Sequence, residues 1–171
     1  MTPEAQFAVR EAEASDAESI ARVHVDSWRE TYAGVLGEDH FSEAAFSRRL
    51  QFWTSYLSLA PRPGQMIVAE LDDVVVGFAC AGEARGPDAE HGFVPARALH
   101  LFSIYLREGA HGGGLGQLMI DAALRDEPAQ LWVLRGNQRA IAFYRRNGFE
   151  ADGVEFIDPA DPNLVTLRMI R

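Results

Sequence analysis

The 171 residues carry 16 basic and 25 acidic side chains, and the net charge of −9 disfavours nucleic acid as a ligand. The apolar content of 47% is ordinary for a globular protein, no apolar run is long enough for a membrane span, and a single cysteine excludes an internal disulfide. Residues 1–4 lack the basic-then-apolar pattern of a signal peptide, and the five histidines show no metal-ligand spacing. We therefore expect one domain, residues 1–171, in the cytoplasm, with no membrane partner and no metal.

The first 95 residues predict strands and helices in alternation. A strand is expected over 7–12, and Ser15 with Glu18 forms a capping box for a helix that ends near Trp28. The elements that follow are a helix at 43–59, a hairpin of strands 66–71 and 74–80 joined by Asp72-Asp73, and a polar loop at 83–95.

The second half predicts a strand, a glycine-rich loop and a helix, and then a further sheet. The strand covers 99–106 and the loop begins at His111. A buried strand at 131–134, a helix at 137–147 that stops at Gly148, and closing strands at 154–157 and 164–170 complete the chain. This order predicts an α+β fold with helices around a mixed sheet.

The glycine-rich loop at 111–117 is the most informative segment. Glycines let a backbone adopt positive φ and approach a ligand, and the free N–H groups of the helix that follows favour an anion such as a phosphate. The loop has no lysine, which excludes a Walker A motif, and Gln117 stands where a dinucleotide fingerprint starting at Gly112 needs glycine or alanine. A flexible hairpin or an ordinary helix start is the alternative interpretation.

A second motif lies about twenty residues further on. On a helix over 137–147, Asn137, Ile141 and Tyr144 fall near one face, with Ala140 and Phe143 beside them.

Together these two segments resemble the GNAT superfamily of N-acetyltransferases. The pyrophosphate loop of that family, Arg/Gln-x-x-Gly-x-Gly/Ala, matches 111–116, and its segment Asn-x-x-Ala-x-x-Phe-Tyr-x-x-x-Gly-Phe matches 137–149. The family's arginine or glutamine is His111 here, so backbone N–H groups must carry most of the pyrophosphate recognition. The resemblance implies an α+β fold with a mixed, mostly antiparallel sheet and helices on both faces in three α/β/α layers. It also implies splayed strands that form the acetyl-CoA cleft.

The resemblance further implies acetyl-CoA as the cofactor and assigns residues to it. Backbone groups of the strand before the loop would meet the pantetheine arm, the loop would hold the pyrophosphate, and the second motif would complete the site. The expected cofactor residues are Ile104, Tyr105, Leu106, His111, Gly112, Gly113, Gly114, Leu115, Gly116, Gln117, Asn137, Ala140, Phe143 and Tyr144.

Acetyl transfer to an amine needs an acid for the leaving thiolate and, in most cases, a base for the amine. Tyr144 matches the family's acid, and a phenol can donate a proton to a thiolate. His100 stands where many members carry a glutamate base, and a histidine with a pKa near 6.5 accepts a proton at neutral pH. Glu83 is the second candidate base and Ser103 a polar helper. His100 is equally well explained as a packed strand histidine.

The acceptor side is expected on the N-terminal helices. Candidate substrate residues are Trp28, Glu30, Tyr32 and Phe41, and the aromatic rings form either a pocket for a cation or part of the core. The segment 27–36 is similar to one in bacterial acetyltransferases that act on polyamines and small amines. We therefore expect direct attack of a small primary amine on acetyl-CoA. A protein N-terminal or lysine acetyltransferase, a non-catalytic acyl-CoA-binding module, and a homodimer remain open alternatives.

Overall fold

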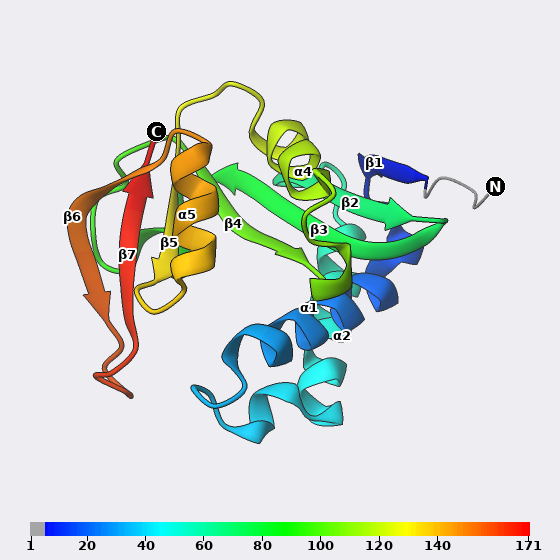
Figure 1. Ribbon diagram of the computed structural model, residues 1–171, viewed down its shortest axis with the longest axis horizontal. Helices are drawn as coiled ribbons and strands as arrows, with labels where there is room; N and C mark the ends of the chain where they lie inside the picture. Colours follow the sequence, from blue (N-terminus) through cyan, green and yellow to red (C-terminus); the bar gives the residue numbers. More distant parts are fainter. Residues whose placement is uncertain (1–5) are drawn as a thin grey trace. The chain divides into compact units, whose positions relative to one another are not determined.

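The computed structural model describes residues 6–171, so the stretch inspected for a signal peptide lies outside the described part. Hydrogen bonding orders seven strands as β1-β2-β3-β4-β5-β7-β6. Three of the pairs, β1 with β2, β5 with β7 and β6 with β7, are antiparallel, and β4 with β5 is parallel. Helices flank this sheet (Figure 1). The expected α+β fold with a mixed, mostly antiparallel sheet is confirmed.

The chain forms two compact units that each combine distant segments of sequence. The first unit contains the residues up to Cys80 together with Ser103–Arg125, and the second contains Ala81–Phe102 together with Asp126–Arg171. Strands β3 (Val74–Glu83) and β4 (Leu99–Leu106) therefore each contribute to both units.

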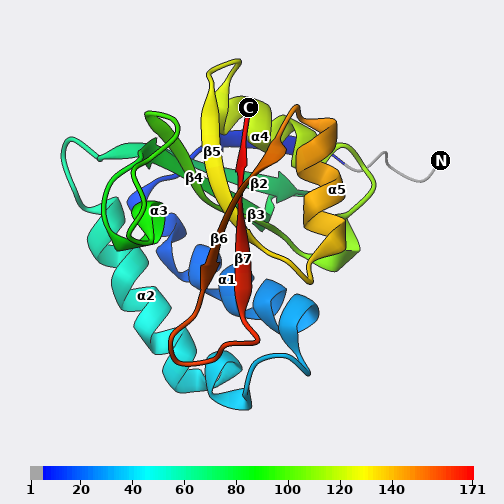
Figure 2. The ribbon, with the colours of Figure 1, turned by 90° about the vertical axis from the view of Figure 1, so that its left-hand side faces the viewer.

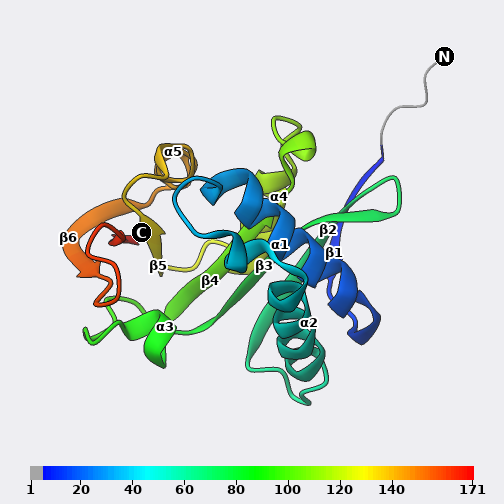
Figure 3. The same cartoon turned by 90° about the horizontal axis from the view of Figure 1, so that it is seen from below.

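The first unit places helices on both faces of its strands. Helices α1 and α2 lie on one face of β1, β2 and β3, and α4 lies on the other (Figures 1 and 3). Its remaining elements have the bounds β1 Phe7–Glu11, α1 Ala17–Tyr32, α2 Glu43–Leu57, β2 Gly64–Leu71 and α4 Leu115–Leu124. The core between the helices and the strands is apolar, with Ile20, Trp53 and Phe78 among its buried side chains.

The β2–β3 hairpin follows from its two turn residues. Asp72 has φ of 50° and Asp73 has φ of 63°, and two consecutive left-handed residues form the turn whose twist matches a two-residue hairpin. The carboxylate of Asp72 also accepts a hydrogen bond from the backbone N–H of Gln6 at 3.0 Å. The hairpin expected from the sequence is therefore present, with strands slightly longer than expected.

The second unit is built around a three-stranded antiparallel arrangement in which the last strand of the chain is central. Strand β7 lies between β5 and β6 and pairs with both (Figure 1), and Figure 2 views these strands from the β6 side. Helices α3 and α5 lie on opposite sides of β5 (Figures 1 and 3). The bounds are α3 Pro87–Glu90, β5 Ala129–Leu134, α5 Gln138–Arg146, β6 Glu150–Ile157 and β7 Val165–Ile170.

Three local expectations need correction. The capping box involves Glu13 and Asp16 rather than Ser15 and Glu18, because the backbone N–H of Glu13 donates to the Asp16 carboxylate at 2.7 Å and a short 3-10 turn precedes α1. The polar loop at 83–95 contains the helix α3. Strand β6 begins at Glu150 rather than Val154, and its register with β7 shifts between Ala151 and Glu155.

Within residues 6–171, every helix is too short or too polar to cross a lipid bilayer.

Candidate active site

The backbone of the glycine-rich loop turns on two left-handed glycines just before α4. Gly112 and Gly114 both have φ of 83°, and Gly114 is the residue that caps the start of α4. The N–H groups of the first helical residues have no partner inside a helix, so those of Leu115 and Gly116 are directed out of the start of α4. The positive end of the helix dipole adds to this. The loop therefore offers backbone donors to a negatively charged group, as the sequence predicts.

Gly113 has a different role, which is a close contact with the first strand. A Cβ atom at this position would lie 3.1 Å from Cζ of Phe7 on β1. This contact is tighter than most Cβ atoms make, so a side chain here would require the Phe7 ring to shift by a few tenths of an ångström. The loop is thus positioned by its packing as well as by its own turns.

His111 points back to the strand that precedes the loop. Its Nε2 lies 2.6 Å from the carbonyl oxygen of Leu106, so the ring donates an N–H there. The short 3-10 turn Glu108–Ala110 lies between the two residues. His111 stands where the family has arginine or glutamine. Its imidazole therefore connects the loop to the end of β4 by a hydrogen bond.

The end of β4 is held against β3 by its backbone, and it carries one large aromatic side chain, Tyr105. The N–H of Arg107 donates to the carbonyl oxygen of Val76 at 2.9 Å, which holds this end of β4 against β3. Tyr105 stacks on His24 with ring centroids 5.0 Å apart, and burial raises the pKa of Tyr105 to about 12. The Tyr105 side chain thus belongs to an aromatic cluster, while Ile104 and Leu106, its neighbours in the strand, point to the other face.

Helix α1 is joined to the turn before the loop at two points. The Glu30 carboxylate accepts a hydrogen bond from the backbone N–H of Glu108 at 2.9 Å, and Asp26 forms an ion pair with Arg107 at 3.1 Å. Glu30 was expected to bind substrate, and the structure places it against the segment that leads into the glycine loop. Trp28 and Tyr32, on the same helix, pack edge to face with ring centroids 5.5 Å apart.

In the second unit, the motif at 137–149 forms helix α5 and its two ends, and this explains the spacing of its residues. Asn137 caps the helix, because its side-chain oxygen accepts from the N–H of Ala140 at 3.1 Å. Ile141 and Tyr144 are buried, and Gly148 has φ of 82°, which ends the helix. The Tyr144 ring packs near Phe143 and Phe149. Motif residues such as Asn137 and Tyr144 thus have a structural role besides any role in binding.

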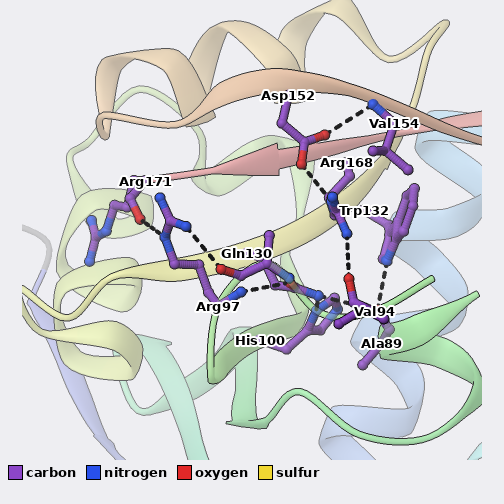
Figure 4. Close-up of polar contacts among 11 residues, drawn as sticks. Ala89, Val94, Arg97, His100, Gln130, Trp132, Asp152, Val154, Arg168 and Arg171 are labelled. Atoms are coloured by element: carbon purple, nitrogen blue, oxygen red, sulfur yellow. Dashed lines mark hydrogen bonds and ion pairs between the residues drawn. The ribbon is translucent and has the colours of Figure 1, made fainter.

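His100 lies in a buried hydrogen-bond network on the α3 side of β5 (Figure 4). Gln130 organises this network: its Nε2 donates to the carbonyl oxygen of Ala89 and to Nδ1 of His100, each at 3.2 Å. Its side-chain oxygen accepts from the N–H groups of Ala96 and Arg97 at 2.6 and 3.1 Å. Burial lowers the pKa of His100 to about 4, so the ring is neutral at pH 7.

The structure does not bring the expected acid and the first expected base together. His100 is 2% exposed and faces α3, whereas α5, which carries Tyr144, lies on the other side of β5 (Figures 1 and 3). Glu83, the second candidate, lies at the end of β3 with an exposed side chain and forms an ion pair with Arg85. Of the two candidate bases, Glu83 is the one that solvent can reach.

One charged residue near the expected acceptor side was missed by the sequence analysis. Arg49 on α2 lies over the ring of Trp28, with its Cζ 4.5 Å from the ring centroid, and its Nη1 is 2.9 Å from Nε2 of His24. The available signal was spacing: His24 and Trp28 on α1, like Arg49 and Trp53 on α2, are four residues apart and share a helix face.

Comparison with known proteins agrees with this arrangement. The model of the acetyltransferase (GNAT) family matches residues 18–149, which is more than half of the chain. A probable N-acetyltransferase of Mycobacterium tuberculosis is 28% identical over 152 residues, covering 86% of this chain and 82% of its own. The L-amino acid N-acetyltransferase AaaT of Escherichia coli is 28% identical over 151 residues, covering 86% and 85%.

Solved structures share the fold. The PaiA N-acetyltransferase of Thermoplasma acidophilum, solved with coenzyme A, has a TM-score of 0.69 at 18% identity and covers 95% of this chain and 98% of its own. The yncA protein of Salmonella typhimurium, solved with its cofactor acetyl-CoA, has a TM-score of 0.65 at 20% identity, with 96% of this chain and 92% of its own covered. With the family model matched across the glycine loop and the second motif, the chain belongs to the GNAT family of acetyltransferases.

Proposed function

We propose that this enzyme transfers an acetyl group from acetyl-CoA to a small primary amine by direct attack within a ternary complex. The observation that carries the proposal is the start of α4, where two left-handed glycines and the free helix N–H groups form an anion site inside a matched acetyltransferase domain. A pyrophosphate is the anion that acetyl-CoA presents. The PaiA and yncA structures, solved with coenzyme A and acetyl-CoA, support the same cofactor.

The cofactor residues of the proposal lie in two groups, one in each unit. In the first unit, the loop 111–117 takes the pyrophosphate, and the backbone of Ile104, Tyr105 and Leu106 takes the pantetheine arm. In the second unit, α5 contributes Asn137, Ala140, Phe143 and Tyr144.

Two proton transfers accompany the acetyl transfer, one to the leaving thiolate and one from the amine. The neutral amine nitrogen attacks the thioester carbonyl carbon, and a backbone N–H of β4 stabilises the oxyanion. The carbon–sulfur bond then breaks, and the Tyr144 hydroxyl protonates the leaving thiolate. Glu83, directly or through water, takes the proton that the amine loses. His100 supports the strands and remains a candidate base only if the carboxylate of Glu83 proves dispensable.

The acceptor of the proposal is a small amine that enters beside α1. The name of the Escherichia coli relative, an L-amino acid N-acetyltransferase, describes an acceptor of this size. A lysine side chain or a protein N-terminus is the second class of acceptor. No observation in residues 6–171 favours it over the small amine.

The test is a screen of amines against acetyl-CoA that follows release of free thiol. The panel contains polyamines, monoamines, amino acids and short peptides with a free N-terminus or lysine. We expect thiol release that depends on a small amine and yields its N-acetyl derivative by mass spectrometry. Acetyl-CoA binding without thiol release for any amine would instead identify an acyl-CoA-binding module, and turnover of peptides alone would move the acceptor to proteins.

A further inference from the structure

The Arg49 cluster consists of His24, Trp28, Arg49, Trp53 and Tyr105, all in the first unit. Two rings contact the guanidinium: Trp28 lies beneath it, and His24 contacts it through Nε2. His24 in turn stacks on Tyr105 and receives a hydrogen bond at Nδ1 from Nε1 of Trp53 at 3.2 Å. The cluster thus joins α1, α2 and β4 around one half-buried positive charge.

This charge has no anionic partner in the described part of the chain. None of the ion pairs among residues 6–171 includes Arg49, and burial lowers the pKa of its guanidinium from the usual value. Arg10 is the internal contrast. It is paired with Asp16 at 2.8 Å and Glu70 at 2.6 Å, and these partners raise its pKa. An arginine that serves only to hold elements together is normally paired in this way.

The hydrogen-bonding capacity of the guanidinium is also unfilled. Its Nε is buried and has no partner among the described residues. Its contacts to His24 use Nη1 alone. A neutral imidazole has one acceptor nitrogen, so His24 cannot satisfy both Arg49 and Trp53. Burial and the charge of Arg49 lower the pKa of His24 to about 3, so the ring is neutral and does not balance the charge of Arg49.

These observations point to a carboxylate. A guanidinium has a planar fork of donors that matches the two oxygens of a carboxylate, and such pairs are among the strongest hydrogen bonds in proteins. A cationic group is disfavoured here because Arg49 repels it and already covers the face of Trp28. Trp28 belongs to the helix on which the acceptor is expected, and Tyr105 belongs to the strand on which the cofactor arm is expected.

We infer that Arg49 binds a carboxylate of the acceptor, so that the acetylated amine is an amino acid or a similar amine that carries a carboxylate. The inference rests on the proposed function and narrows its acceptor. Amino acids and polyamines both offer a reacting amine. An amino acid also presents a negative carboxylate to Arg49, whereas a polyamine presents a further positive charge, so the inference favours amino acids as acceptors.

The test compares acceptors in matched pairs that differ only in the carboxylate. The pairs are ornithine and putrescine, lysine and cadaverine, and leucine and 3-methylbutylamine, with the amide of each amino acid as a neutral third form. With the wild-type enzyme and acetyl-CoA, we expect kcat/KM to favour at least one amino acid over its amide and its decarboxylated partner by roughly tenfold to a hundredfold.

Three variants connect that preference to the side chain. Arg49→Gln should remove the preference mainly through a raised KM for the amino acid, and Arg49→Lys should restore part of it. Arg48→Gln, on the exposed face of the same helix, is the matched control and should keep the wild-type preference. The affinity for acetyl-CoA, measured by calorimetry, should be equal in all four proteins.

The remaining outcomes are distinguishable. Equal turnover of the amino acid and its decarboxylated partner overturns the inference and leaves the proposed function in place. A preference for the amino acid that survives Arg49→Gln also overturns the inference. A loss of acetyl-CoA affinity in Arg49→Gln overturns it as well, because the guanidinium would then bind a phosphate of the cofactor. If no amine is acetylated while acetyl-CoA binds, the proposed function fails and the inference fails with it.

Discussion

The carboxylate of Glu30 and the backbone N–H of Glu108 are joined by a hydrogen bond of 2.9 Å. Glu30 is on α1, and Glu108 begins the 3-10 turn Glu108–Ala110 that leads into the glycine loop. The helix on which the acceptor is expected therefore positions the segment on which the cofactor is expected.

The first prediction concerns this hydrogen bond. Glu30→Ala should weaken acetyl-CoA binding about fivefold, because a hydrogen bond of this kind contributes about 1 kcal/mol. Calorimetric titration with acetyl-CoA measures the change. Glu18→Ala, an exposed position earlier on α1, is the control and should bind as the wild type does. If Glu30→Ala keeps its cofactor affinity and changes only the KM of the amine, Glu30 acts on the acceptor instead.

Gly114 allows a test of the loop with a strain-matched control. Gly114 and Gly153 have φ of +83° and +88°, and neither has a neighbouring atom within 4 Å of an added Cβ. Replacing either by alanine forces an L-residue into the left-handed region at about 1–2 kcal/mol. We expect Gly114→Ala to weaken acetyl-CoA binding and Gly114→Val to abolish it, whereas Gly153→Ala binds normally despite a similar loss of stability. Equal affinities in all these proteins would remove the loop from the cofactor site.

The acid role of Tyr144 predicts a change in rate with little change in binding. Tyr144→Phe should lower kcat on the order of 10²-fold, because only the departing thiolate needs the hydroxyl. The affinity for acetyl-CoA should stay within a few-fold, since the buried ring and its contacts with Phe143 and Phe149 remain. Steady-state kinetics from pH 6 to 9, together with calorimetry, measure both quantities. A kcat within twofold of the wild type at every pH would exclude Tyr144 as the acid.

The two candidate bases predict different pH–rate profiles. An ordinary histidine base makes the rate rise with pH near 6.5. Because burial lowers the pKa of His100 to about 4, any rise in rate due to His100 lies below the pH range in which the enzyme is assayed. We expect His100→Gln to keep the profile between pH 6 and 9. Glu83→Gln should lower the rate at neutral pH and recover toward high pH, where more amine is unprotonated. The opposite pattern would return the role to His100.

His100 also predicts how stability depends on pH. Its pKa is about 4 in the folded protein and about 6.5 when exposed, so between these values the unfolded chain binds a proton that the folded protein does not. The stability contributed by neutral His100 is therefore complete above pH 6.5 and declines as the pH falls toward 4. Urea unfolding should show the wild type losing roughly 3 kcal/mol more than His100→Gln over this interval. Equal losses would mean that His100 titrates as an exposed histidine.

Much of the fold was predictable because its signals are local. The hairpin turn at Asp72-Asp73, the glycine that begins α4 and the Asn137 cap of α5 each act through the backbone within a few residues. Helix α3 was missed because four residues are too few to show a helical period. The early start of β6 was missed because Gly153, with φ of 88°, interrupts the alternation of side chains there.

The candidate site was less predictable because its side chains interact over long separations. The environment of His100 depends on Gln130 and Ala89, thirty and eleven residues away, and neither distance carries a sequence signal. Arg49 looked like one more solvated charge on a helix. Its significance depends on Trp28 beneath it and on the lack of a carboxylate beside it in residues 6–171, which only the folded chain reveals.

The interleaved units also bear on the order in which the protein is made. The first unit has all its residues once Arg125 has been synthesised, whereas the second waits for β7, the last strand in the chain and the one between β5 and β6. Folding during synthesis proceeds from the N-terminal side. The segments of the first unit, the glycine loop among them, can therefore come together before the second unit has its last strand. Residues 81–102, made before the loop, must then wait for Asp126–Arg171, the rest of their unit.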